Sequence, residues 1–440
     1  MPDRTLDPMK ITGDPLKDSG LSTRAVHAGT APDPATGARI TPIYQTASYV
    51  FEDTDHAARL FNLDEIGQTY SRITNPTVQA LEGKMAALDG GAGAIATASG
   101  QAAQFLAFLP LLEPGDHFVA SRNLYGGSVT QFSQSFARLG WRVTFIDPTI
   151  ADNFGAAITP RTKAIFCETL SNPGGLVVDL EAVAAIAGDA KVPLMVDNTL
   201  ATPALCRPLD WGADITVYST TKFIGGHGNA IGGMIVDSGR FNWDGRYPAL
   251  TEANQAYHGM RFAEKFGALA YTVYGHAVGL RDFGPAMAPM TAFLTLTGAE
   301  TLMLRMARHC ENALQVARHL ETKPGVAWVS YAGLGSSPSF DLAAKYLPDG
   351  AGAVLTFGLV GGYGAAVKMV EACRLFSHLA NVGDTRSLII HPASTTHRAL
   401  SAEARAAAGA GPDVVRLSVG IEDAADLIAD LDQALAAATG

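Results

Sequence analysis

Short apolar runs alternate with longer helical patterns through the middle of the chain. Helix-length patterns such as QAAQFLAFLPLL and VTQFSQSFARLG stand between the earlier runs. Strands and helices in alternation are typical of βαβ units, so we predict an α/β fold with a mostly parallel sheet flanked by helices. The runs that predict strands are AIATAS (94–99), HFVAS (117–121), RVTFID (142–147), AIFCET (164–169), PLMVDN (193–198), ITVYST (215–220) and GGMIVD (232–237).

The pattern changes toward both ends of the chain. Residues 1–75 show little periodicity and are predicted to form an N-terminal arm, of which the first twenty residues, polar and without the apolar core of a signal peptide, form a loose segment. Residues 76–290 hold the α/β domain. Residues 291–440 open with the long helical pattern TLMLRMARHCENALQVARHLE and continue with strand runs such as AVLTFGLV and VVRLSVGI. This part is predicted to be a smaller α+β domain.

Composition excludes several classes of protein. With 440 residues, 48% of them hydrophobic and 17% charged, the chain is too long for one core and has an ordinary globular balance. A formal charge of −10 argues against a nucleic-acid surface. The four cysteines form no CxxC pair and the eleven histidines no HExxH motif, so no metal site is predicted. The apolar runs are too short to cross a bilayer, so we expect no membrane partner and a cytoplasmic location.

Polar residues follow five of the predicted strands. Ligands of an open parallel sheet bind at the carboxyl ends of its strands, so polar groups at several such ends predict one common site. These groups are Thr97–Gln101, Tyr125, Glu168–Asn172, Asp197 and Ser219–Lys222.

Lys222 is the most informative of these residues. It follows ITVYST, a run of β-branched residues that predicts a buried strand. A lysine there is costly unless it is neutral or bonded, and a Schiff base with an aldehyde cofactor meets both needs. The hydroxyls of Ser219 and Thr221 are suited to phosphate oxygens. The helix that opens at Gly100 and Gln101 offers backbone N–H groups for the same phosphate.

Two further residues complete the requirements of pyridoxal phosphate. Asp197 ends an apolar strand and could keep the ring nitrogen protonated, which lets the ring accept electrons from a substrate carbanion. Tyr125, at a strand-to-helix turn, could stack on the ring. Alone, Asp197 reads as a turn residue or helix cap, Tyr125 as a packing residue and Lys222 as a surface lysine. Their order on successive strand ends favours the joint interpretation.

Other interpretations have less support. GAGAIA (91–96) fits the GxGxxA pattern of dinucleotide-binding proteins, but it precedes a strand, whereas that fingerprint follows one. A non-catalytic protein of the same fold would be expected to lack Lys222 or Asp197, and both are present.

The sequence resembles the Cys/Met-metabolism class of fold-type I pyridoxal-phosphate enzymes from about residue 21 onward. Within the class it is most similar to the O-acetylhomoserine sulfhydrylases, which share SGQAAQ, TKFIGGHGNAIGG, an aromatic insert (241–259) and VGDTRSLIIHPASTTH (382–397). The class motifs appear in order as TYSRITNPT (69–77), TASGQAA (97–103), NLYGGS (123–128), ETLSNPGG (168–175), VDNT (196–199), DITVYSTTKFIGGHG (214–228) and RLSVGIE (416–422).

The resemblance implies a role for each matching residue. Lys222 would hold the cofactor and move protons, with Asp197 at the pyridine nitrogen and Tyr125 on the ring. The implied phosphate contacts are Gly100, Gln101, Ser219 and Thr221, completed by Tyr70 and Arg72 of a neighbouring subunit. The implied substrate contacts are Arg416 and Asn172 at the α-carboxylate, with Asn381 and Tyr70, while Glu168 would orient nearby polar groups.

The implied reaction is γ-replacement on O-acetyl-L-homoserine by sulfide, giving L-homocysteine and acetate for methionine biosynthesis. The implied assembly is a homotetramer of two dimers with shared active sites. Two residues differ from those of related enzymes in the class. Gly127 stands where methionine γ-lyases have cysteine, which argues against a lyase, and Ala380 stands where cystathionine-processing relatives have an acid, which argues against cystathionine as substrate. O-succinylhomoserine as donor, methanethiol as nucleophile, cystathionine γ-synthase-like activity and methionine γ-lyase activity remain open.

Overall fold

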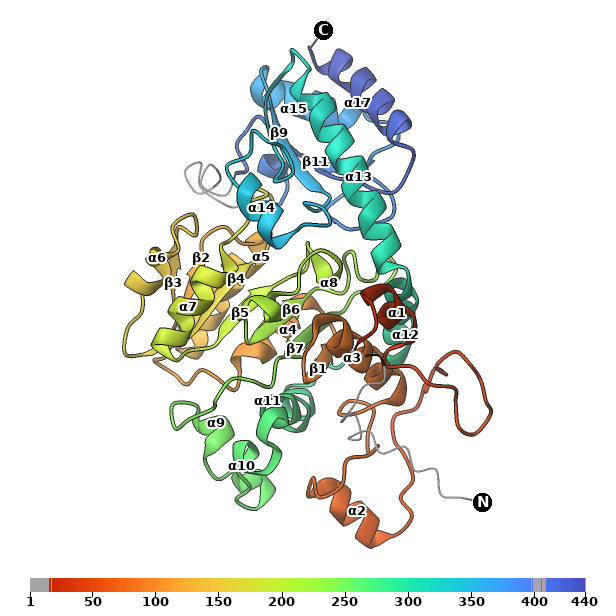
Figure 1. Ribbon diagram of the computed structural model, residues 1–440, viewed down its shortest axis with the longest axis vertical. Coiled ribbons are helices and arrows are strands. Elements are labelled where there is room, and N and C mark those ends of the chain that lie inside the picture. The colour runs from red at the N-terminus through yellow and green to blue at the C-terminus, as the bar shows by residue number, and fades with distance from the viewer. Residues whose placement is uncertain (1–15, 17, 397, 399–404, 406–408, 440) are drawn as a thin grey trace. The chain divides into compact units, whose positions relative to one another are not determined.

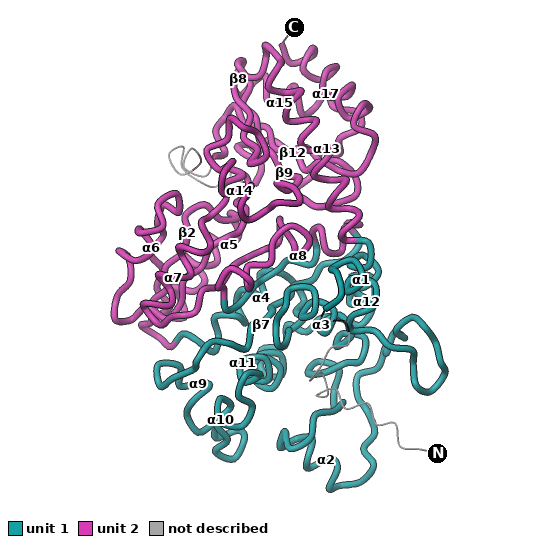
Figure 2. The backbone as a smooth tube through the Cα atoms, in the orientation of Figure 1, with its two compact units in different colours: residues 1–112, 214–221, 229–301 teal, residues 113–213, 222–228, 302–440 magenta. Residues whose placement is uncertain are grey.

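The computed structural model describes residues 16, 18–396, 398, 405 and 409–439 (Figure 1). Most of the predicted loose segment, residues 1–15 and 17, lies outside the described residues, and so does His397 at the end of one family motif. The described chain forms two compact units, each assembled from separate segments (Figure 2). Unit 1 comprises residues 1–112, 214–221 and 229–301, and unit 2 comprises residues 113–213, 222–228 and 302–440.

All seven strands predicted in the middle of the chain are confirmed. Within unit 1 the strand order is β1-β7-β6, and within unit 2 it is β5-β4-β2-β3. The strands are β1 (Gly93–Thr97), β2 (His117–Ser121), β3 (Arg142–Ile146), β4 (Thr162–Glu168), β5 (Leu194–Asp197), β6 (Ile215–Tyr218) and β7 (Gly233–Asp237).

In unit 1, β7 runs antiparallel to both of its neighbours, with Ile235 opposite Ile95 on β1 and opposite Val217 on β6. Helix α3 packs on β1 and β7, and α4 packs on β6 and β7. The helices are α1 (Leu21–His27), α2 (Thr54–Phe61), α3 (Pro76–Asp89), α4 (Gly100–Phe108), α9 (Pro248–Thr251), α10 (Phe262–Phe266), α11 (Ala270–Tyr274) and α12 (Pro289–Glu300), with a π-helix over Gly275–Phe283.

Local sequence signals explain where α3 begins and ends. The Asn75 side chain accepts hydrogen bonds from the N–H groups of Thr77 and Val78, and Pro76 occupies the first turn. Gly90 ends the helix in the left-handed conformation, with φ of 79°.

Inside unit 1, α3 also holds α1 through a buried lysine. Lys84 is fully buried, and its ammonium group donates hydrogen bonds to the carbonyl oxygens of Ala25 and Val26, the latter at 3.3 Å. Both carbonyls belong to the last turn of α1, where a positive charge is favourable. Burial lowers the pKa of Lys84 to about 8.

In unit 2, β5, β4, β2 and β3 are parallel. The central residues of β5, β4 and β2 are buried, whereas those of β3 are partly or fully exposed. Glu168 and Asp197 are register partners at the carboxyl ends of β4 and β5, so the two carboxyl groups begin from neighbouring positions. The helices associated with this part are α5 (Gly126–Thr130), α6 (Asp152–Ala156), α7 (Leu180–Ala190) and α8 (Thr202–Leu205).

The C-terminal part of unit 2 contains a second sheet, formed by five strands, together with four helices of the described residues. Its order is β10-β11-β12-β9-β8, antiparallel except for the β10–β11 pair. The predicted long helix is confirmed as α13, which packs on β8 and α17. The elements are α13 (Leu302–Glu321), β8 (Val326–Ser330), α14 (Phe340–Tyr346), β9 (Val354–Leu359), α15 (Gly362–Ala372), β10 (Ser377–His378), β11 (Leu388–Ile390), β12 (Val414–Ser418) and α17 (Ala424–Thr439).

Among the described residues, no helix has the length and apolar character needed to cross a bilayer. Nor does this part of the chain bring three or more His, Cys, Asp or Glu side chains together in a metal-binding arrangement.

Candidate active site

Lys222 lies just beyond β6 with its side chain largely withdrawn from solvent. Its Nζ donates a hydrogen bond of 2.5 Å to Oδ1 of Asn381. Burial, and secondly the positive charge of Arg416, lowers the pKa of Lys222 to about 8. Near neutral pH this amine is therefore uncharged far more often than an ordinary lysine, as a nucleophile and proton carrier requires.

Arg416, on β12, is the second charged group of this site. Its side chain is buried, and burial lowers its pKa to about 10, so the guanidinium stays positive at neutral pH. Nη1 donates to Oδ1 of Asn172 at 3.2 Å, and Nη2 donates to the carbonyl oxygen of Asn381 at 3.1 Å. The residues predicted to bind the substrate carboxylate are thus brought together beside Lys222, although they come from distant parts of the sequence.

Glu168 has a larger role than its sequence motif indicates. Its buried carboxylate accepts a 2.7 Å hydrogen bond from the backbone N–H of Tyr125, and another from the backbone N–H of Asn172. Burial first, and then the nearby charge of Asp197, raises the pKa of Glu168 well above its ordinary value. Glu168 therefore joins the Tyr125 turn to the Asn172 loop.

Because the Glu168 carboxyl group accepts hydrogen bonds from two backbone N–H groups, Glu168→Gln should be tolerated and Glu168→Ala should not. Glutamine keeps a carbonyl oxygen that can accept the Tyr125 and Asn172 hydrogen bonds, whereas alanine leaves both buried N–H groups unpaired. We expect kcat/KM to fall no more than about 3-fold in Glu168→Gln and at least about 10-fold in Glu168→Ala, the loss of about 1.4 kcal/mol or more that unpaired donors bring. Steady-state kinetics measures both, and equal losses would contradict this role for Glu168.

Two of the predicted phosphate ligands of unit 1, Gly100 and Ser219, lie close together at the start of α4. Ser99 caps the helix by accepting a hydrogen bond from the N–H of Ala102. Gly100 lies so close to Ser219 that a Cβ atom added at position 100 would come within 2.8 Å of the Ser219 Cβ. The hydroxyl of Thr221 is engaged by the backbone of Gly232, donating to its oxygen at 3.2 Å and accepting from its N–H at 3.1 Å.

Gly100→Ala should weaken cofactor binding because the added methyl group would push Ser219 away from the helix start. Gly188→Ala, inside α7, is the matched control, since a Cβ atom there meets nothing within 4 Å. We expect the dissociation constant of pyridoxal phosphate to rise about 10-fold in Gly100→Ala, roughly the value of one charge-assisted hydrogen bond, and to stay unchanged in Gly188→Ala. Fluorescence titration of the cofactor-free proteins gives both constants. An unchanged constant in Gly100→Ala would remove position 100 from the phosphate site.

Tyr70 and Arg72 are exposed neighbours on the N-terminal arm. The Arg72 guanidinium lies 5.5 Å from the centre of the Tyr70 ring, and its Nη1 donates to the carbonyl oxygen of Arg281 at 2.6 Å. The two side chains contact each other, and no ion pair of Arg72 is present among the described residues. That Tyr70 and Arg72 complete the phosphate site of a neighbouring subunit stays a prediction.

No role was predicted for Arg305 or Arg386, two arginines that contact the loop after Lys222, although Arg386 lies in the motif VGDTRSLIIHPASTTH (382–397). Arg305 donates to the carbonyl oxygens of Phe223 and Ile224, and Arg386 donates to that of His227. One signal was available: Arg305 shares the buried face of α13 with Leu302 and Met306, where an apolar residue is expected.

Comparison with known proteins identifies the family. Residues 22–436 match the family described as Cys/Met metabolism PLP-dependent enzymes. The chain belongs to this family. Its relatives include an O-acetyl-L-homoserine sulfhydrylase of Thermus thermophilus, 51% identical over 94% of this chain and 100% of the relative, and one of Leptospira meyeri, 47% identical over 94% and 96%. A homocysteine synthase of Schizosaccharomyces pombe is 48% identical over 96% and 99%.

A solved structure agrees with the family assignment. A Campylobacter jejuni protein assigned as an O-acetylhomoserine (thiol)-lyase superposes with a TM-score of 0.92 at 37% identity, covering 95% of this chain and 100% of that one. That structure contains N'-pyridoxyl-lysine-5'-monophosphate. The fold-type I expectation is thereby confirmed, and this family member uses pyridoxal phosphate.

The residues present fit this cofactor. Lys222 supplies a buried amine with a lowered pKa, which suits an aldehyde. In unit 1, Gly100 and Ser219 approach each other at a helix start, where a side chain on residue 100 would collide with the serine. Unit 2 therefore supplies an amine suited to the aldehyde of the cofactor, and unit 1 supplies a helix start suited to its phosphate.

Proposed function

We propose that the chain transfers the aminobutyrate part of O-acetyl-L-homoserine to sulfide, forming L-homocysteine and acetate. The geometry that carries the proposal is the 2.5 Å contact of Lys222 Nζ with Asn381, whose own carbonyl oxygen is held by Arg416 at 3.1 Å. An amine of lowered pKa beside a carboxylate-binding arginine suits an α-amino-acid substrate. The sulfhydrylase and homocysteine synthase relatives, 47–51% identical over nearly the whole chain, support the particular reaction.

Each residue then has a defined task. Arg416 and Asn172 bind the substrate α-carboxylate through charge-assisted hydrogen bonds. That contact places the substrate Cα near Lys222, which removes the Cα proton and returns protons later in the reaction. Bound pyridoxal phosphate supplies an electron sink that stabilises the negative charge produced when the Cα proton leaves. Lys222 would anchor this group, Asp197 would keep its ring nitrogen protonated and Tyr125 would stack on its ring.

Protein groups also hold these residues in place. Glu168 fixes the turn of Tyr125 and the loop of Asn172. We propose that the phosphate is bound by Ser219, Thr221 and the backbone at Gly100 and Gln101. Binding there requires the Thr221 hydroxyl to share or give up its bonds to Gly232.

One packing detail supports a sulfhydrylase over a methionine γ-lyase. A Cβ atom at Gly127 would lie 2.4 Å from Cε1 of Tyr125. The cysteine expected at this position in a γ-lyase therefore requires a different placement of the tyrosine ring. The ring of Tyr125, which is expected to stack on the cofactor, occupies a position that only a glycine at residue 127 leaves free.

Kinetics with paired substrates tests the proposed reaction. O-acetyl- and O-succinyl-homoserine are each supplied with sulfide, cysteine or methanethiol, and the products are separated by mass. We expect the acetyl donor with sulfide to give a kcat/KM at least about 10-fold above every other pair, the ratio that about 1.4 kcal/mol of differential transition-state binding provides. A preference for the succinyl donor, for cystathionine formation or for methionine cleavage would each replace the proposed function with the corresponding alternative.

We also propose a cytoplasmic homotetramer of two dimers, in which Tyr70 and Arg72 complete a neighbouring subunit's site. Mixing tests the shared site. Lys222→Ala and Arg72→Ala proteins, each inactive alone, should regain up to about a quarter of the parent activity after subunit exchange, because a quarter of the sites in a random dimer mixture then carry neither substitution. No recovery despite exchange, followed by light scattering and mass labels, would show that each site belongs to one chain.

A further inference from the structure

The loop of residues 222–228, here called the lysine loop, has a constrained backbone. Gly226 and Gly228 have φ values of 73° and 64°, which favour glycine. Space is also restricted, because a Cβ atom at Gly226 would lie 2.2 Å from Nη1 of Arg305, and one at Gly228 would lie 2.3 Å from Oδ2 of Asp384. The absence of a side chain at Gly226 and Gly228 leaves room for the side chains of Arg305 and Asp384 beside the backbone of this loop.

Arg305 contacts the lysine loop from α13. Its buried guanidinium donates to the carbonyl oxygen of Phe223 at 2.7 Å and to that of Ile224 at 3.2 Å. These are the two residues directly after Lys222. Burial lowers the pKa of Arg305 to about 10, which still leaves it charged at neutral pH, so both carbonyl groups accept charge-assisted hydrogen bonds.

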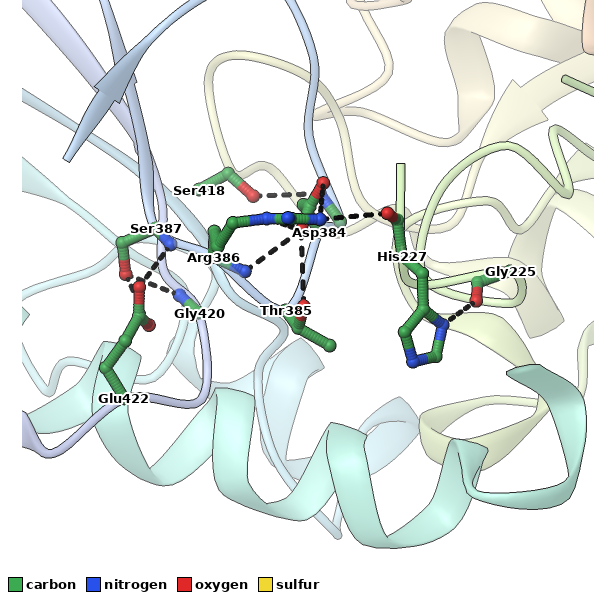
Figure 3. Close-up of polar contacts among 10 residues, drawn as sticks. Gly225, His227, Asp384, Thr385, Arg386, Ser387, Ser418, Gly420 and Glu422 are labelled. Carbon is green, nitrogen blue, oxygen red and sulfur yellow. Dashed lines mark hydrogen bonds and ion pairs between the residues drawn. The ribbon is translucent and has the colours of Figure 1, made fainter. Parts of the chain in front are cut away.

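Arg386 contacts the far end of the same loop (Figure 3). Its Nη2 donates to the carbonyl oxygen of His227 at 2.9 Å, while its Nε donates to Oδ1 of Asp384 at 2.9 Å. The neighbouring N–H of Thr385 donates to the carbonyl oxygen of Gly226 at 2.8 Å. Arginine and backbone groups thus bind the carbonyl oxygens at 223, 224, 226 and 227.

The segment that carries Arg386 also connects to the substrate-binding residues. Asn381 accepts from Lys222 through its side chain and from Arg416 through its carbonyl oxygen. The N–H of Gly383 donates to the hydroxyl of Ser418, two residues beyond Arg416 on β12, at 2.9 Å. The lysine loop and the strand of the carboxylate-binding arginine are therefore bonded to one short segment, residues 381–386.

We propose that Arg305 and Arg386 are positioning residues that fix the reach of Lys222 Nζ by holding the carbonyl groups of the lysine loop. The inference rests on the proposed function only in taking Lys222 as the reacting amine. Proton transfer needs donor and acceptor within hydrogen-bond distance, and a displacement of about 1 Å can cost about 100-fold in rate. Neither arginine is assigned a contact with substrate or cofactor.

The test uses cofactor-loaded protein in four variants: Arg386→Met, Arg305→Lys, Arg305→Met and Arg318→Met. Arg318 is the matched control because it is exposed on the same helix as Arg305 and its side chain makes no hydrogen bond within the described part of the chain. For each variant, kcat and KM are measured per cofactor-loaded site. We also measure the pH at which the cofactor's visible absorption band titrates. A fourth measurement is the rate of amide hydrogen exchange in residues 222–228.

We expect Arg386→Met and Arg305→Met to lower kcat about 10- to 100-fold, with KM changed no more than about 3-fold, since a misplaced amine slows proton transfer without removing the carboxylate contact. Both should shift the pH of the absorption change and speed exchange in the lysine loop. Arg305→Lys, which can keep one carbonyl contact, should recover part of the loss. Arg318→Met should match the parent in all four measurements.

A purely structural role predicts something different. Arg386→Met would then lower the melting temperature but keep the parent kcat and absorption titration, and that result overturns the proposal. If Arg305→Met does not fold, Arg305→Lys and Arg386→Met decide by the same criteria. If the parent shows no sulfhydrylase activity, the proposed function fails, while the absorption and exchange measurements still report whether the arginines position Lys222.

Discussion

Lys222→Ala is expected to reduce turnover at least about 1,000-fold, the scale seen when a residue that performs a chemical step is removed. The Lys222 amine combines burial, a pKa lowered to about 8 and direct contact with Asn381 beside Arg416. Cofactor should still bind noncovalently through the phosphate contacts. The absorption spectrum should therefore change from that of lysine-bound to that of free pyridoxal phosphate.

Lys368→Ala is the matched control, because Lys368 is an exposed lysine on α15 of the same unit. It should keep the parent rate and spectrum. Turnover per site and absorption are read from the same preparations, and borohydride reduction followed by peptide mass locates the cofactor. Parent-like activity in Lys222→Ala, or cofactor attached to another lysine in the parent, would refute the assignment.

Arg416→Lys is expected to lower kcat/KM for the amino-acid substrate about 100-fold or more, mostly through KM. The guanidinium makes two hydrogen bonds in fixed directions, to Asn172 at 3.2 Å and Asn381 at 3.1 Å, and an ammonium group cannot reproduce that fork. Loss of one partner from a buried charged contact costs about 2–5 kcal/mol, which corresponds to this range. The spectrum of the bound cofactor should be unchanged.

Arg374→Lys, at an exposed arginine of the same unit, serves as control and should leave the kinetics unaltered. Since Arg416 is buried, circular dichroism and melting temperature must first show that the variant is folded. Asn172→Ala is a milder change at the same contact and should raise KM about 10-fold. If folded Arg416→Lys kept the parent KM, the substrate carboxylate would have to bind elsewhere.

Much of the fold could be predicted because buried strands and the long α13 pattern leave strong local signals. The direction of β7 could not, since an apolar run such as GGMIVD packs equally well in parallel and antiparallel sheets. The pattern over 129–140 predicted one helix, but the chain forms α5, a π-helix over Gln131–Ser135 and a 3-10 turn over Phe136–Leu139. The rings of Phe132 and Phe136 pack around Phe118, and this long-range packing is invisible to periodicity.

The candidate site also divides into residues that local sequence predicts and residues that it does not. Lys222, Asp197 and Tyr125 follow the ends of strands, where ligands of an open parallel sheet bind, so they were predicted from the residues themselves. Asn381 and Arg416 came from the family resemblance, because no local pattern brings them to Lys222. Arg305 was missed for a related reason: it lies inside a helix that sequence periodicity assigns to the core, and its partners are carbonyl groups, which every residue has.

The hydrogen bonds from Lys84 to the last turn of α1 limit how many N-terminal residues can be removed from this protein. Cutting the polypeptide after His27 would remove the two oxygens that receive its ammonium group and would leave a charge in an apolar interior. Such a product should aggregate during expression, although the missing piece contains none of the residues assigned to catalysis. Fusion partners and cleavage sites intended for crystallisation therefore belong upstream of Leu21.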